Sequence, residues 1–229
     1  MHTTSYQEWF RRRVEIADSI VTNLYHLGLY DAEILLSCAI SGLAAVIWPG
    51  RDIDRARFVE FLIRFSRVEP PMTLISIPRL VAYRREAADL ATAEQLKRAF
   101  YPASNALVVT YRDIDRTEEG VSQVVPGVQR DEIRRASYAS VIYRDLRSAL
   151  VHEFQLSEHL SDSPMTMQQD VPSYWNELEG ATGATDRLLY LPYGYVREVV
   201  STSADAAFEM WQGADSWEQP KPPKWWVEG

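Results

Sequence analysis

The spacing of apolar residues constrains the fold of this chain more than any other feature of its sequence. Apolar side chains recur three and four positions apart in five separate stretches, which is the spacing that lines one face of an α-helix. These stretches lie near residues 5–28, 31–48, 52–66, 130–154 and 193–212. The chain is therefore predicted to be mainly α, folded as a helical bundle.

Residues that commonly begin helices stand at the starts of these stretches. Ser5 with Glu8 three positions later forms a capping box, in which each side chain bonds the backbone of the other residue. Asp31 and Asp131 are expected to cap two further helices because their carboxylates accept hydrogen bonds from free backbone N–H groups. A weaker helical pattern predicts one more helix over residues 78–100.

Short segments rich in β-branched and aromatic residues predict a small β-structure. Residues 107–109 are expected to form a short strand, while the rest of residues 101–129 lacks periodicity and is expected to be loop. Residues 165–167, 173–178 and 187–191 are predicted to be β-segments, and the glycines before the last one favour a hairpin. The fold class is thus a helical bundle with a small C-terminal β appendage.

The domain organisation follows from where these patterns end. Residues 1–213 are expected to form a single helical domain, and residues 214–229 a tail rich in Pro and Trp. Aromatic side chains in such a tail usually anchor it to the body of the domain or to a second subunit. Trp217, Trp225 and Trp226 are the candidates for this contact.

Charge composition limits the partners of the chain. The net charge of −8 argues against binding nucleic acid over the whole surface, although a local basic cleft remains compatible with it. The basic residues are 21 Arg and only 3 Lys. This bias reflects either the base composition of the genome or a need for guanidinium groups, which fit phosphate.

The compartment is expected to be the cytoplasm. Cys38 is the single cysteine, so no internal disulfide can form. It lies in an apolar stretch, residues 34–48, and is expected to be a buried small side chain. That stretch has 15 residues, too few to span a bilayer, and suits a central buried helix. No apolar segment of a secretion signal follows the first basic residues, and no membrane association is expected.

The stretch over residues 131–154 is the one that could carry chemistry. Its buried stripe is predicted from apolar residues spaced four apart, namely Ile142, Leu146 and Leu150. At 100° per residue, Arg144 and Ser148 lie nearly opposite that stripe, and Arg147 and His152 flank them about 140° apart. This face is either ordinary solvent-exposed surface or a cleft that binds phosphate.

The same stretch resembles a known family. The segment Arg147 to His152, with four residues between them, is similar to the Arg-x(4–6)-His motif of HEPN domains, a superfamily of small helical bundles. The wider sequence from Tyr143 to Glu153 is similar to a stretch of bacterial HEPN-like proteins. The resemblance extends to the long preceding helices and the entry into the last helix, and covers most of residues 5–212.

The resemblance implies a homodimer in which the motif faces its symmetry mate, and many family members cut RNA without a metal. It makes Arg147 and His152 catalytic and assigns Arg144 and Ser148 to phosphate binding. Histidine can move a proton near neutral pH, and the arginine fork can stabilise charge on the phosphorus. The implied function is a metal-independent endoribonuclease acting on RNA, as a toxin or defence effector with an antitoxin or regulatory partner.

A second function stays open beside this one. The family also contains inactive scaffolds, so the chain could be a non-catalytic dimeric interaction module of a regulatory or defence system. An exposed arginine and a histidine near a helix end also stabilise an ordinary helix through its dipole. No metal or cofactor is expected, since the HE…EH pattern formed by His152, Glu153, Glu158 and His159 has Leu156 where a zinc-protease motif needs histidine.

Overall fold

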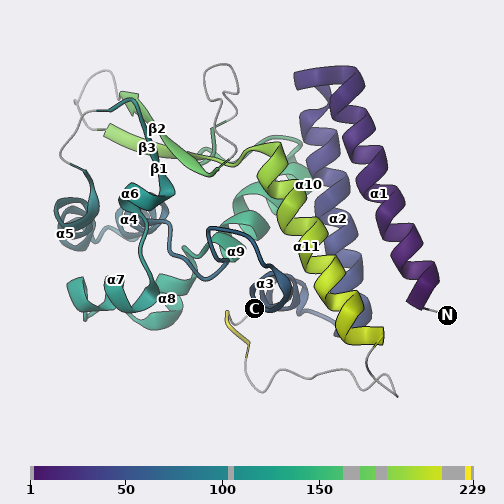
Figure 1. The fold of residues 1–229 in the computed structure, drawn as a ribbon. Helices are drawn as coiled ribbons and strands as arrows, with labels where there is room; N and C mark the ends of the chain where they lie inside the picture. Colours follow the sequence, from purple (N-terminus) through teal and green to yellow (C-terminus); the bar gives the residue numbers. More distant parts are fainter. Residues whose placement is uncertain (1–2, 103–105, 162–170, 179–184, 213–224, 228–229) are drawn as a thin grey trace.

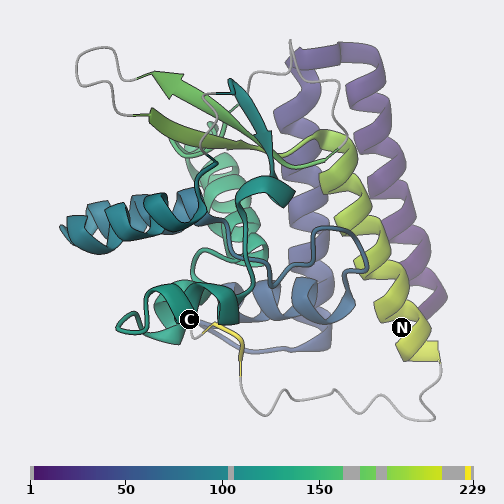
Figure 2. The same ribbon diagram turned by 60° about the vertical axis from the view of Figure 1, so that its left-hand side comes forward.

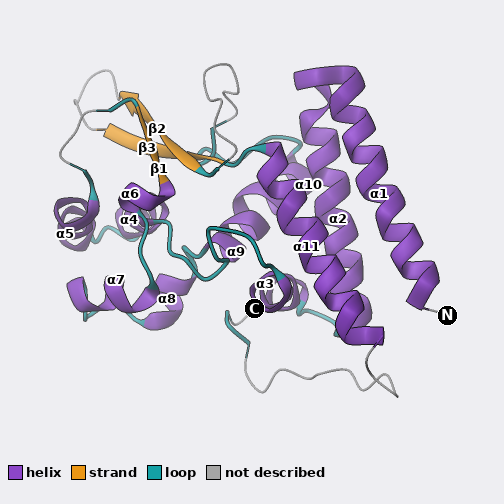
Figure 3. Ribbon diagram, viewed as in Figure 1, coloured by secondary structure: helices purple, strands orange, loops and turns teal. Residues whose placement is uncertain are grey.

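The computed structural model describes residues 3–102, 106–161, 171–178, 185–212 and 225–227. Helices dominate, as predicted, and a small three-stranded sheet accompanies them (Figure 3). The longer helices are α1 (Thr3–Leu24), α2 (Leu29–Ile47), α3 (Asp54–Phe65), α4 (Ile77–Glu86), α5 (Leu90–Phe100) and α11 (Tyr193–Gln212). A 3₁₀ turn, η1 (Tyr25–Gly28), joins α1 to α2.

Helix α2 is the central helix of a bundle with α1, α3 and α11 (Figures 1 and 2). Its inward face is mainly apolar, with Leu36, Ile40 and Ile47 inaccessible to water. By length and composition α2 could cross a membrane, but half of its most apolar window is buried inside the protein, as in a core helix. The prediction for Cys38 was wrong, because its side chain is exposed on the outer face of α2.

The helix predicted over residues 78–100 is two helices. Helix α4 ends at Glu86, and Ala88 takes a left-handed conformation with φ of 57°. The carboxylate of Asp89 then accepts a hydrogen bond from the backbone N–H of Thr92 and caps α5. Two alanines in sequence give no sign of a break, so the capping aspartate is the signal that periodicity alone overlooks.

The helix predicted over residues 131–154 is also interrupted. Its first part is α8 (Arg130–Arg134), which Gln129 caps in place of Asp131. A new start follows at Ser137, whose hydroxyl accepts from the backbone N–H of Ser140. From there α9 (Tyr138–Val141), a π-helical turn η2 (Ile142–Ser148) and α10 (Ala149–Glu153) form one continuous helical segment. The predicted motif lies in its second half.

The sheet consists of β1 (Val108–Thr110), β2 (Ser173–Leu178) and β3 (Thr185–Tyr190), paired antiparallel in that order. The predicted hairpin is confirmed as β2 and β3, and the strand predicted at residues 107–109 becomes its third member. Residues 165–167 lie outside the described residues. The loop expected before residue 129 instead contains the short helices α6 (Tyr111–Ile114) and α7 (Glu118–Val124).

A buried carboxyl group joins the sheet to the helices. The Asp115 carboxylate accepts hydrogen bonds from the hydroxyls of Tyr138 and Tyr174, at 2.8 and 2.7 Å, and from the backbone N–H of Ile77 at 3.0 Å. Complete burial raises the pKa of this carboxyl to about 7. This carboxylate therefore connects the segment after α6 to α9, to β2 and to the N-terminus of α4.

The end of the chain packs on the domain itself. The ring of Trp225 meets that of Trp48 edge-to-face at 5.7 Å. The guanidinium of Arg134 lies 4.2 Å from the ring centre of Trp226, whose backbone N–H donates to the Glu60 carboxylate at 2.9 Å. The anchoring predicted for the tail is confirmed for these two residues, while Trp217 lies outside the described chain.

Candidate functional site

The predicted motif lies on a helical segment that contains a π-helical turn. Arg144, Arg147 and Ser148 belong to η2, and His152 belongs to α10. π-helical turns are rare and recur at functional sites in proteins. Ile142, Leu146 and Leu150 are buried as predicted, so the other side of the segment carries the motif residues.

A buried ion pair connects this segment to helix α4. The Arg79 guanidinium donates from Nε to Asp145 Oδ2 at 2.9 Å and from Nη2 to Oδ1 at 3.3 Å. Both side chains are almost entirely buried, at 4% and 2% exposure. The third contact of Arg79, from Nη1, goes to Glu86 at 3.0 Å. Paired and hydrogen-bonded in this way, the two charges tolerate burial.

Arg144 and Ser148 lie together. Ser148 is half-buried, and the two residues line a hollow of about 430 Å³ with Asp145, Ser157 and His159. The guanidinium of Arg144 stacks on the ring of Tyr83, 4.4 Å from its centre. It also lies 3.6 Å from the Asp145 carboxylate and 4.0 Å from that of Glu86. Arg144 is therefore held in place by groups of the protein.

Arg147 and His152 have a different environment. Arg147 is half-buried, its guanidinium lies 5.4 Å from the ring centre of Tyr143, and its buried Nε has no hydrogen-bond partner in the part of the chain that the structure describes. His152 is exposed. Neither residue lines the hollow of Arg144 and Ser148. The structure thus places the four predicted residues on one helical segment and brings Arg144 and Ser148 together at the hollow, while Arg147 and His152 lie outside it.

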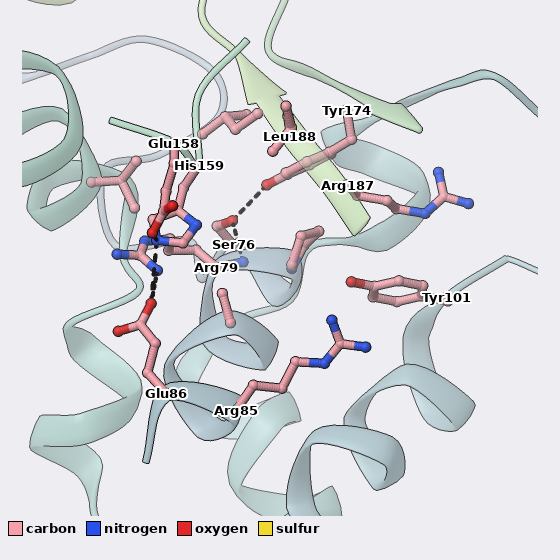
Figure 4. Close-up of a pocket in the computed structure, with 14 residues that line it drawn as sticks. Ser76, Arg79, Arg85, Glu86, Tyr101, Glu158, His159, Tyr174, Arg187 and Leu188 are labelled. Carbon is pink, nitrogen blue, oxygen red and sulfur yellow. Dashed lines mark hydrogen bonds and ion pairs between the residues drawn. The ribbon is translucent and has the colours of Figure 1, made fainter. Parts of the chain in front are cut away.

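His159, which the sequence analysis considered only as part of the rejected zinc pattern, lies near the site. Its Nε2 lies 3.2 Å from Glu86 Oε1 and 3.6 Å from Glu158 Oε1. Burial, reinforced by the charge of Arg79, lowers the pKa of the imidazole. Figure 4 shows Arg79, Glu86 and His159 gathered at one side of a second pocket, which shares His159 with the hollow of Arg144.

Sequence reasoning missed Arg79 and Asp145 for one physical reason. Asp145 and Arg79 are 66 positions apart, and nothing in the local spacing of either residue reveals the other. A charged residue on the buried side of a helix was the available signal, since such a charge needs a partner. Among the described residues, no group of three or more His, Cys, Asp or Glu side chains could hold a metal ion.

Comparison with known proteins gives no relative on which to base a function. No family model, no curated protein and no solved structure matches the chain.

Proposed function

We propose that this protein is a HEPN-type, metal-independent endoribonuclease that acts as a homodimer, in the role of a toxin or defence effector. The observation that carries the proposal concerns the polar contacts of the two motif residues within the described part of the chain. Arg147 and His152 make no ion pair or hydrogen bond through their side chains to the residues that the structure describes. Because these side chains have no hydrogen bond or ion pair to the described residues, they are available to a phosphodiester.

The residue types suit cleavage through the ribose itself. The 2′-hydroxyl of RNA loses its proton and attacks the adjacent phosphorus, and the bond to the 5′-oxygen breaks. The products are a 2′,3′-cyclic phosphate and a 5′-hydroxyl, so atoms and charge balance without a redox partner. His152 would move the proton at the attacking or leaving oxygen, and Arg147 would donate two parallel hydrogen bonds to the phosphate oxygens.

A second copy of the chain would complete the site. One acid–base step takes a proton from the 2′-oxygen and another returns a proton to the 5′-oxygen, yet each chain offers one motif histidine. Two-fold pairing of the segments around Arg147 would supply two imidazoles and two guanidinium groups to one phosphodiester. Bringing these cations together is costly unless an anion lies between them, which favours a phosphate ligand at the contact.

The test is cleavage of single-stranded RNA by the wild-type protein beside His152→Ala and Arg147→Lys. We expect His152→Ala to abolish cleavage with little change in melting temperature, because the imidazole is exposed. Arg147→Lys should lose a factor of about 10²–10³ in rate, because a point charge cannot replace the fork. Arg98→Lys, on the exposed side of α5, is the matched control and should keep full activity.

Three results would each contradict part of the proposal. Cleavage that persists in both motif variants would show that the motif does not carry the activity. Activity lost after EDTA treatment and restored by a divalent ion would contradict the metal-independent mechanism. Sedimentation of the wild-type protein as a monomer at micromolar concentration would contradict the proposed homodimer.

One observation favours a second candidate function, a non-catalytic dimeric interaction module. Large apolar side chains are exposed on α1, among them Trp9 at 39%, Ile16 at 43% and Leu24 at 51%. Rows of exposed apolar side chains commonly mark protein contact surfaces. If the wild-type protein cleaves no RNA, but Ile16→Glu converts a dimer into a monomer, the interaction module is the better assignment.

A further inference from the structure

A second polar pocket lies on the other side of the Arg79–Asp145 pair. It has a volume of about 370 Å³ and lies between one side of α4 and strands β2 and β3. Ser76 and Tyr174 form part of its floor, where their hydroxyls are 2.9 Å apart. Such a volume is in the range of pockets that hold small molecules.

Arg187 on β3 is the feature of this pocket that requires an explanation. It is 8% exposed, and its Nε and Nη1 have no hydrogen-bond partner among the described residues. Its guanidinium lies 5.3 Å from the ring centre of Tyr101, and burial lowers its pKa. A guanidinium removed from water without an acceptor is unfavourable, so the geometry indicates an acceptor that comes from outside the chain.

A second cation lies on the same side of the pocket. Figure 4 shows Arg85 on α4 and Arg187 on β3 near Tyr101, whose ring lies between the two side chains. The third arginine of the pocket, Arg79, is ion-paired with Asp145 and Glu86. Arginine side chains are a common way to hold phosphate, because the guanidinium fork matches the phosphate oxygens.

The opposite side of the pocket has the reverse character. Glu86, Glu158 and His159 lie there, and the imidazole contacts both carboxylates. Acceptors of this kind suit a ligand that carries hydroxyl groups. The pocket therefore has a cationic end and an acidic end, separated by the hydroxyls of Ser76 and Tyr174.

We propose that this pocket binds a small phosphate monoester. The phosphate lies against Arg187 and Arg85, and the hydroxyl-bearing body of the ligand extends toward Glu86 and His159. The proposal does not rest on RNA cleavage, because it uses none of the four motif residues. Sugar phosphates and nucleoside monophosphates share this chemistry, and the experiment distinguishes them.

The experiment is isothermal titration of the full chain with inorganic phosphate, ribose 5-phosphate and adenosine 5′-monophosphate. We expect at least one of the two esters to bind, and more tightly than inorganic phosphate. Arg187→Gln should weaken ester binding about 10–100-fold, the loss typical of hydrogen bonds to a charged group. Tighter binding of the nucleotide or of the sugar phosphate identifies the source of the phosphate.

Two further variants keep the test decisive. Arg85→Gln removes the half-exposed second cation, and we expect it to weaken binding even if Arg187→Gln fails to fold. Arg98→Gln removes the same charge from the exposed surface of neighbouring α5 and should leave binding unchanged. No binding of any probe at millimolar concentration would overturn the proposal. Equal affinity of the wild type and both pocket variants, or equal affinity for inorganic phosphate and the esters, would overturn it as well.

Discussion

Glu33 is a carboxyl group on the inward side of α2, at 3% exposure. Burial raises its pKa to about 8 from an ordinary value of 4.5. The folded chain therefore holds a proton that the unfolded chain releases, and stability falls as the pH rises through this window. At about 1.4 kcal/mol per pKa unit, the loss by pH 7 is about 3 kcal/mol.

Glu33→Gln is expected to remove this dependence on pH, because an amide does not ionise. Relative to the wild type, the variant should gain about 3 kcal/mol more stability at pH 8 than at pH 5. Urea unfolding at the two pH values measures this difference. Glu94→Gln, on the exposed side of α5, is the control, and equal behaviour of the two variants would refute the prediction.

Single residues also show where sequence reasoning reaches its limit. The positions of Arg144, Arg147, Ser148 and His152 away from the buried stripe followed from helical spacing alone. The burial of Arg187 did not, because it depends on how a short strand packs against α4 and Tyr101. Contacts between distant segments carry no local pattern, so polar residues that meet in a pocket cannot be selected from spacing.

Among the elements, the junction between α4 and α5 gives a direct test of backbone conformation. Ala88 has φ of 57°, where a Cβ atom is strained, whereas Ala87 has φ of −81°. We expect Ala88→Gly to stabilise the fold by about 0.5–1 kcal/mol. The matched variant Ala87→Gly should destabilise it by a similar amount. Thermal unfolding of the two variants measures these changes in stability. Changes of the same sign in both variants would contradict the left-handed conformation assigned to Ala88.

Element boundaries were predicted less well than element types. The stretches near residues 5–28, 31–48, 52–66 and 193–212 each contain a long helix, because their apolar spacing persists over several turns. The breaks at Ala88 and Ser137 were missed because each is produced by one capping side chain, Asp89 or Ser137, inside a continuing apolar pattern. Capping acts through one or two hydrogen bonds. A search for apolar periodicity over a whole helix does not detect such a local signal.

At the scale of the whole molecule, the mainly helical fold with a small sheet was predictable from the sequence. The predicted sequence elements did not reveal that the middle strand, β2, pairs with a strand from far earlier in the chain. They also did not show that the segment around Ile75 runs between Arg116 and Ser137. These pairings fix how the sheet sits on the helices, and they depend on tertiary packing.

The C-terminal contact should contribute to the stability of the whole domain. Trp225→Ala removes the half-buried ring that packs on Trp48, and we expect a loss of about 1–2 kcal/mol. Trp225→Phe should recover part of that loss because it keeps an aromatic edge at the same place. Denaturant unfolding measures both. An unchanged midpoint for Trp225→Ala would mean that the contact is not formed in solution.

The π-helical turn η2 affects where insertions and deletions can be tolerated as the sequence evolves. A π turn accommodates one residue more than the α turn that it replaces, so an inserted or deleted codon can be absorbed there. The flanking turns, Tyr138–Val141 and Ala149–Glu153, would then keep their orientation. We therefore expect descendants of a common ancestor to differ by single-residue gaps within residues 142–148, while the imidazole of His152 keeps its position.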